Sequence, residues 1–326
     1  MKALLVKNEE LVLSEVAQPV PGEEEVLVRV RAAGVNRADV LQRHGKYPSP
    51  AGCPPWPGLE IAGEVVEVGA VAAEKGNWKI GDGVCALLGG GGYAEYAVVR
   101  YDMLLPVPRG FSFARAAALP EVWATSYLNL FEEGHLEAGQ TAFIPAGTSG
   151  LATAAIPLAR AFGARVITTV RNEASARAIA ALGADRVIIS AGPEVAAALK
   201  EEEEAGHPVN VAMDCLSGDA LGESLPYMAR GGYWVVISTL AGIETKVPLR
   251  PLLTKGLHLV GSMLRNRTPA FKAEVLAALR EKVWPLLENG TLKTSEPNVL
   301  PFAEAMEAHR RLEAGGNVGK IVLIPE

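Results

Sequence analysis

The apolar and polar positions along the chain follow two different patterns. The first hundred residues hold short β-branched runs, among them VLVRV, GEVVEVG and YAEYAVV, separated by Pro and Gly clusters. This spacing predicts an antiparallel or mixed β domain. From about Phe113, Ala-rich helical segments alternate with compact strands such as ARVITTV, NVAMDCL and GYWVVIS. Strands alternating with helices predict βαβ units and a buried parallel sheet.

The last part of the chain departs from that alternation. After Met263 comes a helical stretch, PAFKAEVLAALREKVWPLL, and the chain closes on the apolar strand KIVLI. The strand–helix alternation is complete before this part begins. We therefore expect the C-terminal segment to return to the N-terminal domain.

Composition excludes several classes of protein. Of the 326 residues, 49% are hydrophobic, which is enough for a folded core and excludes a disordered chain. The net charge is −6, so electrostatic attraction does not favour nucleic acid as a partner. No apolar run approaches the roughly 18 residues of a membrane span, and the first residues turn charged too early for a signal peptide. Three scattered cysteines fit reduced thiols. We expect a cytoplasmic protein without a membrane partner.

One turn carries the strongest chemical signal. The apolar strand TAFI runs into PAGTSGL and then into an apolar periodic segment. Gly147 matches the first glycine of the dinucleotide fingerprint, Ser149 replaces the second, and Ala152 is the alternative allowed at the third. Gly150 and Leu151 complete the approach to the helix, whose free N–H groups would face a pyrophosphate. A plain strand–helix turn is the alternative.

The end of the following strand bears on the choice of cofactor. Proteins that prefer NAD place an acidic residue there, on the ribose 2′-hydroxyl, whereas this chain has Arg171 followed by Asn172. A cation suits a 2′-phosphate, so NADPH is favoured over NADH. Glu173 weakens this argument, and a solvent-exposed Arg171 without a ligand is the alternative.

Several further motifs, taken together, carry a family resemblance. They are GVNRAD at 34–39, GKYP at 45–48, PGLEIAG at 57–63, Gly81-Asp82 and NVGK at 317–320. With the turn above, they resemble the zinc-free quinone oxidoreductases of the medium-chain dehydrogenase/reductase superfamily over essentially the whole chain. ALPEVWATSY and GSMLRNR look most like the p53-inducible type.

The resemblance implies an α/β fold in two domains. A Rossmann domain with a doubly wound parallel sheet would cover residues 118–262, and a mainly β, GroES-like catalytic domain would cover 1–117 and 263–326. The cofactor would bind in the cleft between them.

The same resemblance implies an enzyme without a metal ion. Zinc alcohol dehydrogenases of the superfamily have Cys where Asn36 stands and His where Leu59 stands, and Glu121 stands at the position of the third ligand. Leucine cannot ligate zinc, and the cysteine-rich structural zinc lobe has no counterpart. A zinc alcohol dehydrogenase is therefore nearly excluded.

The resemblance also assigns site residues. Asn36 and Tyr47 match positions that face the nicotinamide pocket and are the expected catalytic donors, with a turn-capping amide and a packing aromatic as the alternatives. Ser175 and Ser190 stand where relatives use Lys and Tyr around the 2′-phosphate, which leaves that task mainly to Arg171. The remaining expected cofactor-binding positions are Thr125, Ser238, Leu240, Leu264, Arg265 and Asn317.

The expected function is metal-free hydride transfer from NADPH to a quinone or similar electrophilic carbonyl, because without zinc the substrate must already be electrophilic. One-electron and two-electron transfer are both open. An enone or enoyl-thioester reductase is the enzymatic alternative, and a structural NADPH-binding protein is the non-enzymatic one. Relatives commonly pair the edge strands of two Rossmann sheets, so a homodimer or homotetramer is expected, with GYWVVIS or LHLVGSM at the edge.

Overall fold

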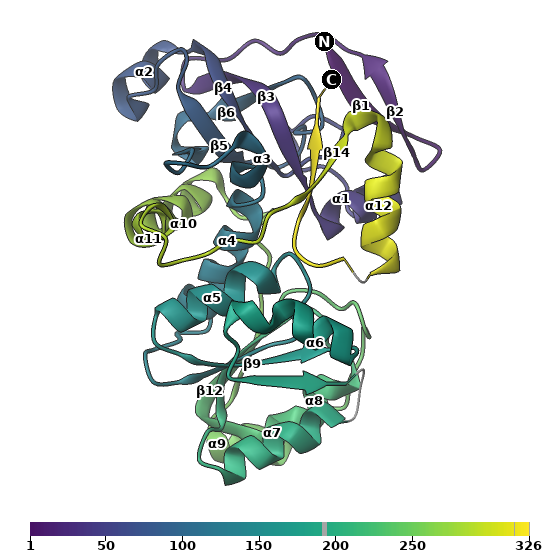
Figure 1. Cartoon of the computed structure of the whole chain (residues 1–326), viewed down its shortest axis with the longest axis vertical. Coiled ribbons are helices and arrows are strands. Elements are labelled where there is room, and N and C mark those ends of the chain that lie inside the picture. Colours follow the sequence, from purple (N-terminus) through teal and green to yellow (C-terminus); the bar gives the residue numbers. More distant parts are fainter. Residues whose placement is uncertain (191–193, 316, 326) are drawn as a thin grey trace. The chain divides into compact units, whose positions relative to one another are not determined.

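The computed structural model describes residues 1–190, 194–315 and 317–325. The chain forms two compact units, drawn in Figure 1. Unit 1 comprises residues 1–124, 265–290 and 295–326, and unit 2 comprises residues 125–264 and 291–294. No helix among the described residues is long and apolar enough to cross a membrane.

Unit 1 is built around a mostly antiparallel sheet. Within the described ranges the sheet has seven strands, in the order β14-β15-β3-β4-β5-β7, with β6 also pairing with β3. A separate hairpin joins β1 and β2, and its two-residue turn has Asn8 and Glu9 at positive φ. The strands are β1 (Lys2–Lys7), β2 (Glu10–Glu15), β3 (Glu25–Val35), β4 (Glu60–Val68), β5 (Gly83–Leu87), β6 (Tyr96–Arg100), β7 (Leu104–Pro106), β14 (Asn298–Pro301) and β15 (Ile321–Ile324).

Two segments far apart in sequence meet in this sheet. The long strand β3 pairs antiparallel with β15, with Val35 opposite Ile321, so the C-terminal strand completes a sheet begun near the N-terminus. Helix α12 packs beside α1 and the hairpin strand β2, as Figure 1 shows. The C-terminal strand and helix therefore belong to unit 1. The helices of unit 1 are α1 (Arg37–Arg43), α2 (Ala70–Gly76), η1 (Tyr101–Met103), α3 (Phe113–Ala116), α10 (Pro269–Lys282), α11 (Trp284–Glu288), η5 (Phe302–Glu304) and α12 (Ala305–Ala314).

Unit 2 is a parallel sheet with helices on both faces. Its strand order in the described part of the chain is β10-β9-β8-β11-β12-β13, and every pair is parallel. The order reverses beside β8, which is the arrangement of a doubly wound dinucleotide-binding sheet. Its strands are β8 (Thr141–Ile144), β9 (Arg165–Val170), β10 (Arg186–Ile189), β11 (Val209–Asp214), β12 (Met228–Val236) and β13 (His258–Gly261). The predicted α/β fold class is confirmed.

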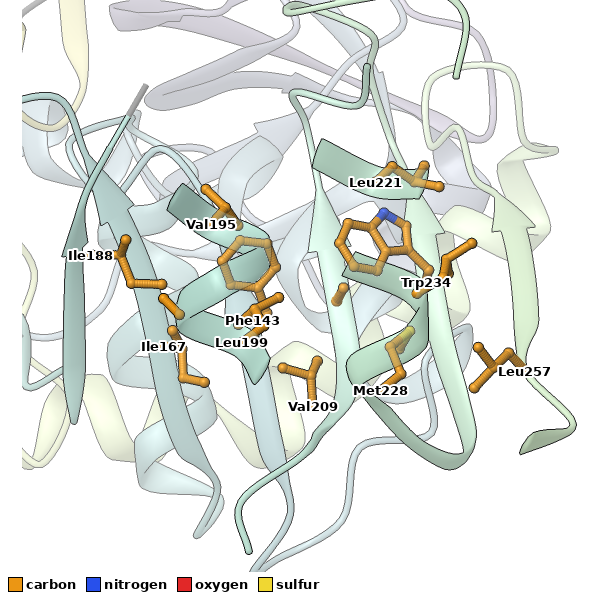
Figure 2. Close-up of a cluster of buried hydrophobic side chains, with 13 residues drawn as sticks. Phe143, Ile167, Ile188, Val195, Leu199, Val209, Leu221, Met228, Trp234 and Leu257 are labelled. Carbon is orange, nitrogen blue, oxygen red and sulfur yellow. The ribbon is translucent and has the colours of Figure 1, made fainter. Parts of the chain in front are cut away.

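The helices of unit 2 cover a core on each face of the sheet. Phe143, Val209 and Trp234 contribute to the cluster drawn in Figure 2, together with side chains of α7 and α8. The neighbouring Ile144 belongs to a second cluster with residues of α5. Successive residues of a strand point to opposite faces, so the continuous apolar runs in the sequence reflect burial on both sides. The helices are α5 (Ala152–Ala161), α6 (Glu173–Ile179), η3 (Ala180–Leu182), α7 (Glu194–Glu204), α8 (Asp219–Ser224), η4 (Leu225–Tyr227) and α9 (Leu249–Lys255), and α4 (Pro120–Tyr127) and η2 (Leu128–Glu132) lead into this unit.

Candidate active site

Asn36 lies where β3 ends and α1 begins, and its side-chain amide is held at both ends. The Lys320 ammonium donates to Asn36 Oδ1 at 2.7 Å. Asn36 Nδ2 donates to Glu60 Oε1 at 3.0 Å. The amide therefore has one orientation, and since its nitrogen carries two hydrogens, it keeps one N–H beyond the bond to Glu60.

The two residues that hold Asn36 form a buried ion pair. Lys320 Nζ lies 2.5 Å from Glu60 Oε1, and the two side chains are 7% and 0% exposed. Glu60 Oε2 accepts the backbone N–H of Glu121 at 2.9 Å, and Lys320 also donates to the Val35 carbonyl at 2.9 Å. Buried charges are tolerated when they are paired and hydrogen-bonded in this way.

Gly34 makes room for the Glu60 carboxylate. A Cβ atom at this position would lie 2.2 Å from Glu60 Oε1 and 2.6 Å from its Cδ, far inside contact distance. Any side chain here would displace the carboxylate and with it the partner of Asn36. The glycine in GVNRAD is therefore required by the close approach of Glu60.

Asp39 fixes the backbone around Asn36. Its carboxylate accepts the N–H of Asn36 at 2.8 Å and that of Gly58 at 2.8 Å, which joins the start of α1 to the segment leading into β4. Burial raises the pKa of Asp39 from 3.8 to about 6, against these hydrogen bonds, which lower it. The hydroxyl of the buried Tyr93 lies 3.2 Å from Asp39 Oδ2 and 3.3 Å from His309 Nε2.

Tyr47 lies just after α1, beyond Gly45, whose φ is +68°. Its side chain is half-buried, and burial raises the pKa of the phenol above 10, with Glu121 adding to the effect and Arg265 opposing it. Since even an ordinary tyrosine, with a pKa of about 10, is protonated at neutral pH, the phenol can donate a hydrogen bond.

Asn36 and Leu59, which the resemblance aligns with zinc ligands of alcohol dehydrogenases, are poorly suited to hold zinc. Leu59 is a buried hydrocarbon side chain, and Asn36 Oδ1 already faces the ammonium of Lys320. A positive charge at this distance disfavours a second cation on the same oxygen. Among the described residues, no group of three or more His, Cys, Asp or Glu side chains could hold a metal ion.

In unit 2 the turn between β8 and α5 is held by β9. Thr169 accepts the N–H of Ala146 through its hydroxyl and that of Gly147 through its carbonyl, at 3.0 and 2.8 Å. A Cβ at Gly147 would lie 2.7 Å from the Thr168 hydroxyl, so the first fingerprint glycine is required by packing against β9.

The N-terminus of α5 offers backbone donors. The Ser149 hydroxyl accepts the N–H of Ala152 at 3.1 Å. The first N–H groups of a helix have no acceptor within the helix, so those near Gly150 and Leu151 suit a phosphate. These residues fit the pyrophosphate of a dinucleotide.

The three residues expected around a 2′-phosphate lie beyond β9 and β10. Arg171 directly follows β9 and is exposed. Ser175 donates its N–H to Asn172 Oδ1 at 2.9 Å, as part of the cap of α6. The Ser190 hydroxyl donates to Glu194 Oε2 at 2.6 Å. Arg171 is thus the cation among the three.

Ser238 and Leu240 lie in a loop held by β11. The Ser217 hydroxyl donates to the Ser238 carbonyl at 2.9 Å, and Leu240 donates its N–H to the Cys215 carbonyl at 3.3 Å. Asp214, at the end of β11, accepts the N–H groups of Leu216 and Ser217 and the indole N–H of Trp234. Asp214 therefore sets the shape of this loop.

The other predicted cofactor-binding residues lie in both units. Thr125, whose carbonyl accepts from Asn129 Nδ2 at 2.7 Å, and the buried Leu264 belong to unit 2. Asn317 lies in unit 1, where its Nδ2 donates to the Gly319 carbonyl at 2.8 Å. Arg265 also belongs to unit 1, and its guanidinium is bonded to oxygens of that unit. No contact in the structure tests their role toward a cofactor, so these remain predictions.

Sequence reasoning quoted Glu60 and Lys320 as motif residues but gave them no role, and it missed Asp214 entirely. A signal was present for two of them. Glu60 opens the apolar strand EIAGEVVEV and Lys320 opens KIVLI, so each places a charge at the start of a buried strand. Charged residues in such positions require partners.

Comparisons with known proteins agree with the fold of the two units. Residues 22–109 match the family model described as "Alcohol dehydrogenase GroES-like domain", and residues 150–281 match "Zinc-binding dehydrogenase". The chain is 33% identical to a quinone oxidoreductase of Pseudomonas aeruginosa over 307 residues, which is 94% of this chain and 92% of that protein.

Two solved structures extend the comparison. The quinone oxidoreductase of Thermus thermophilus, also solved as a complex with NADPH, is similar with a TM-score of 0.82 and 30% identity, over 99% of this chain and all of that one. The CurK enoyl reductase has a TM-score of 0.85 at 23% identity, over 100% of this chain and 98% of that one, and shares the fold.

Proposed function

Because the chain belongs to the quinone oxidoreductase family of the medium-chain dehydrogenase/reductase superfamily, and is therefore an oxidoreductase, we propose that it reduces quinones with NADPH and without a metal ion. The observation that carries the proposal is the Asn36 amide, which Lys320 and Glu60 hold at a metal-ligand position of the zinc enzymes. It replaces a Lewis acid by a fixed neutral donor.

Bound NADPH would supply a hydride from its nicotinamide ring to the substrate. The turn after β8 supports its binding, because α5 begins directly beyond it and the first N–H groups of a helix suit a pyrophosphate. The exposed Arg171 supports a preference for the 2′-phosphate of NADPH over NADH.

The protein would stabilise the negative charge that develops on the quinone oxygen. Asn36 retains one N–H to offer it, and this donor is held in place by a buried ion pair. Preorganised donors of this kind stabilise a developing oxyanion without reorganisation. Tyr47, whose phenol is protonated at neutral pH even at the ordinary tyrosine pKa of about 10, would donate a second hydrogen bond or a proton.

Purified enzyme treated with a chelator tests the proposal. We expect NADPH oxidation with an ortho-quinone or a para-quinone, and a loss of about 100-fold in kcat for Asn36→Ala, since removing one oxyanion donor costs this much. Faster turnover of a simple enone or an enoyl thioester would favour the reductase class of CurK instead. Binding of NADPH without turnover of any electrophile would contradict enzymatic function.

We further propose that two copies associate through β13. This strand pairs with β12 on one side and forms an edge of the sheet of unit 2. Leu259 in its middle is 40% exposed, and an apolar, exposed edge strand is a template for pairing with another chain.

A further inference from the structure

Arg265 is a buried cation, and each of its three guanidinium nitrogens donates a hydrogen bond to an oxygen of unit 1. Its side chain is 5% exposed. Nε donates to the Gly89 carbonyl at 2.8 Å, Nη1 to the Tyr47 carbonyl at 3.2 Å, and Nη2 to Gln42 Oε1 at 2.6 Å. One side chain thus joins the end of α1, the segment that carries Tyr47 and the loop after β5.

The same guanidinium contacts the aromatic ring of Tyr47. Its central carbon lies 4.8 Å from the ring centroid, within the range of a cation–π contact. Arg265 therefore fixes both the main chain and the ring of Tyr47. A planar fork with separate donors is needed for this, and a lysine ammonium lacks that geometry.

Gln42 extends the arrangement to the rest of the loop. While its Oε1 accepts from Arg265, its Nε2 donates to the Ser49 hydroxyl and to the Pro55 carbonyl, each at 2.9 Å. Because Arg265 fixes the amide of Gln42, it also sets the position of residues 49–55, the segment that follows Tyr47.

The charge of Arg265 is not neutralised by these partners. All three acceptors are neutral oxygens, so none of these hydrogen bonds brings a negative charge to the buried guanidinium. A buried charge that is hydrogen-bonded to neutral groups is costly, and such groups gather at functional sites. Glu121 and Lys272 are the charged groups that share these surroundings, and Lys272 donates to the Arg265 carbonyl at 3.3 Å.

We propose that Arg265 is a positioning residue for the reaction: its guanidinium holds the main chain and the ring of Tyr47, and its positive charge favours negative charge at the Tyr47 hydroxyl. This inference deepens the proposed function and rests on it for the catalytic role of Tyr47. It differs from a direct contact with the cofactor, because the guanidinium donors are directed to oxygens of the protein itself.

The first test needs no turnover. The ionisation of Tyr47 is followed by the ultraviolet absorbance of tyrosinate in the full-length protein, as the difference from Tyr47→Phe. Since the charge of Arg265 lowers the pKa of Tyr47 and Glu121 raises it, Arg265→Gln should raise that pKa and Glu121→Gln should lower it. An unchanged Tyr47 pKa in Arg265→Gln overturns the inference whether or not the protein reduces quinones.

A second variant covers the case in which Arg265→Gln fails to fold. Gln42→Glu keeps an acceptor in front of Arg265 and places a carboxylate against its charge. It should raise the pKa of Tyr47 in the same direction. A lowered Tyr47 pKa in Gln42→Glu would contradict the inference.

Kinetics separate positioning from cofactor binding. Arg265→Lys keeps the charge and loses the fork, so kcat with quinone should fall by about 100-fold, while KM for NADPH stays unchanged. Combined with Tyr47→Phe, it should cause no further loss, because both changes remove the same donor. A raised KM for NADPH at unchanged kcat, or additive losses, would overturn the inference. Arg267→Gln is the matched control, since that guanidinium also lies 4.8 Å from a ring centroid, that of Phe271.

Discussion

The ammonium of Lys320 lies 2.5 Å from Glu60 Oε1 inside unit 1, with both side chains almost completely removed from solvent. In water such a pair would be worth little, because solvent screens it. Buried, each charge depends on the other, and Asn36 depends on both for its orientation. The site and the stability of unit 1 are therefore coupled through one ion pair.

Removing one partner of this pair should be costly. We expect Lys320→Met to lower the free energy of unfolding by about 3 to 5 kcal/mol, because Glu60 is left as a buried uncompensated charge. The double variant with Glu60→Gln should lose less than the sum of the two single variants. Denaturant unfolding of the four proteins measures this coupling.

The exposed pair Arg31–Glu64 is the matched control. Its atoms lie 2.6 Å apart, but the side chains are 45% and 39% exposed. Arg31→Met should therefore cost less than about 1 kcal/mol. Equal losses for Arg31→Met and Lys320→Met would show that burial of the Lys320–Glu60 pair has no energetic consequence.

The sequence predicts the two folded units better than it predicts this pair. Periodicity in runs such as ARVITTV and VLVRV indicates strand type and burial, and these follow from local rules. The neighbourhood of Asn36 and Lys320 follows instead from the register that sets Val35 opposite Ile321, across most of the chain length. No local pattern encodes that register.

The roles of single residues also depend on whether a local sequence pattern encodes them. The role of Gly147 is predictable from its place in a motif, since a turn of that kind has a local signature. The resemblance predicts a cofactor-binding role for Arg265, whereas its contacts with Gly89, Tyr47 and Gln42 depend on three segments that meet only in the fold. Contacts between side chains that lie far apart in the sequence are therefore visible in the structure and not in the sequence pattern.

Asp39 and His309 should give opposite pH dependences of stability. Burial raises the pKa of Asp39 from 3.8 to about 6, so the stability that its bound proton contributes is present below pH 3.8 and is lost as the pH rises to about 6. Burial, with Arg43, lowers the pKa of His309 from 6.5 to about 3. The contribution of neutral His309 is therefore present above pH 6.5 and is lost as the pH falls toward 3.

Single variants should separate the pH dependence of stability that Asp39 causes from the one that His309 causes. Relative to wild type, the free energy of unfolding of Asp39→Asn should rise with pH between pH 4 and 6, by up to about 3 kcal/mol, and that of His309→Gln should fall over the same interval. Urea unfolding across this range measures both. If the free energy of unfolding of both variants changed with pH in parallel with that of the wild type, neither group would titrate with a shifted pKa.

Arg171 should decide between the two nicotinamide cofactors. Its exposed side chain follows β9, while the Ser190 hydroxyl is bonded to Glu194. We expect Arg171→Ala to raise KM for NADPH by about tenfold and to leave KM for NADH unchanged, because only NADPH carries the 2′-phosphate. Arg177→Ala, at an exposed position of α6, is the control. Equal changes for both cofactors would remove Arg171 from phosphate recognition.

Association through β13 should depend on Leu259. A second copy that pairs with this edge would cover the side chain, which is 40% exposed in the single chain. It would also bond to the side of β13 that faces away from β12, where no described strand pairs with it. A lysine at an edge strand opposes such pairing, because its charge would be buried in the interface.

Light scattering measures this association. The wild type should have a mass of about twice the 34.3 kDa of one chain, or a higher even multiple, and Leu259→Lys should have a smaller mass. Ile80→Lys, at an exposed apolar position of unit 1, should keep the wild-type mass. A monomeric wild type would exclude the dimer, and an unchanged mass in Leu259→Lys would place the interface elsewhere than β13.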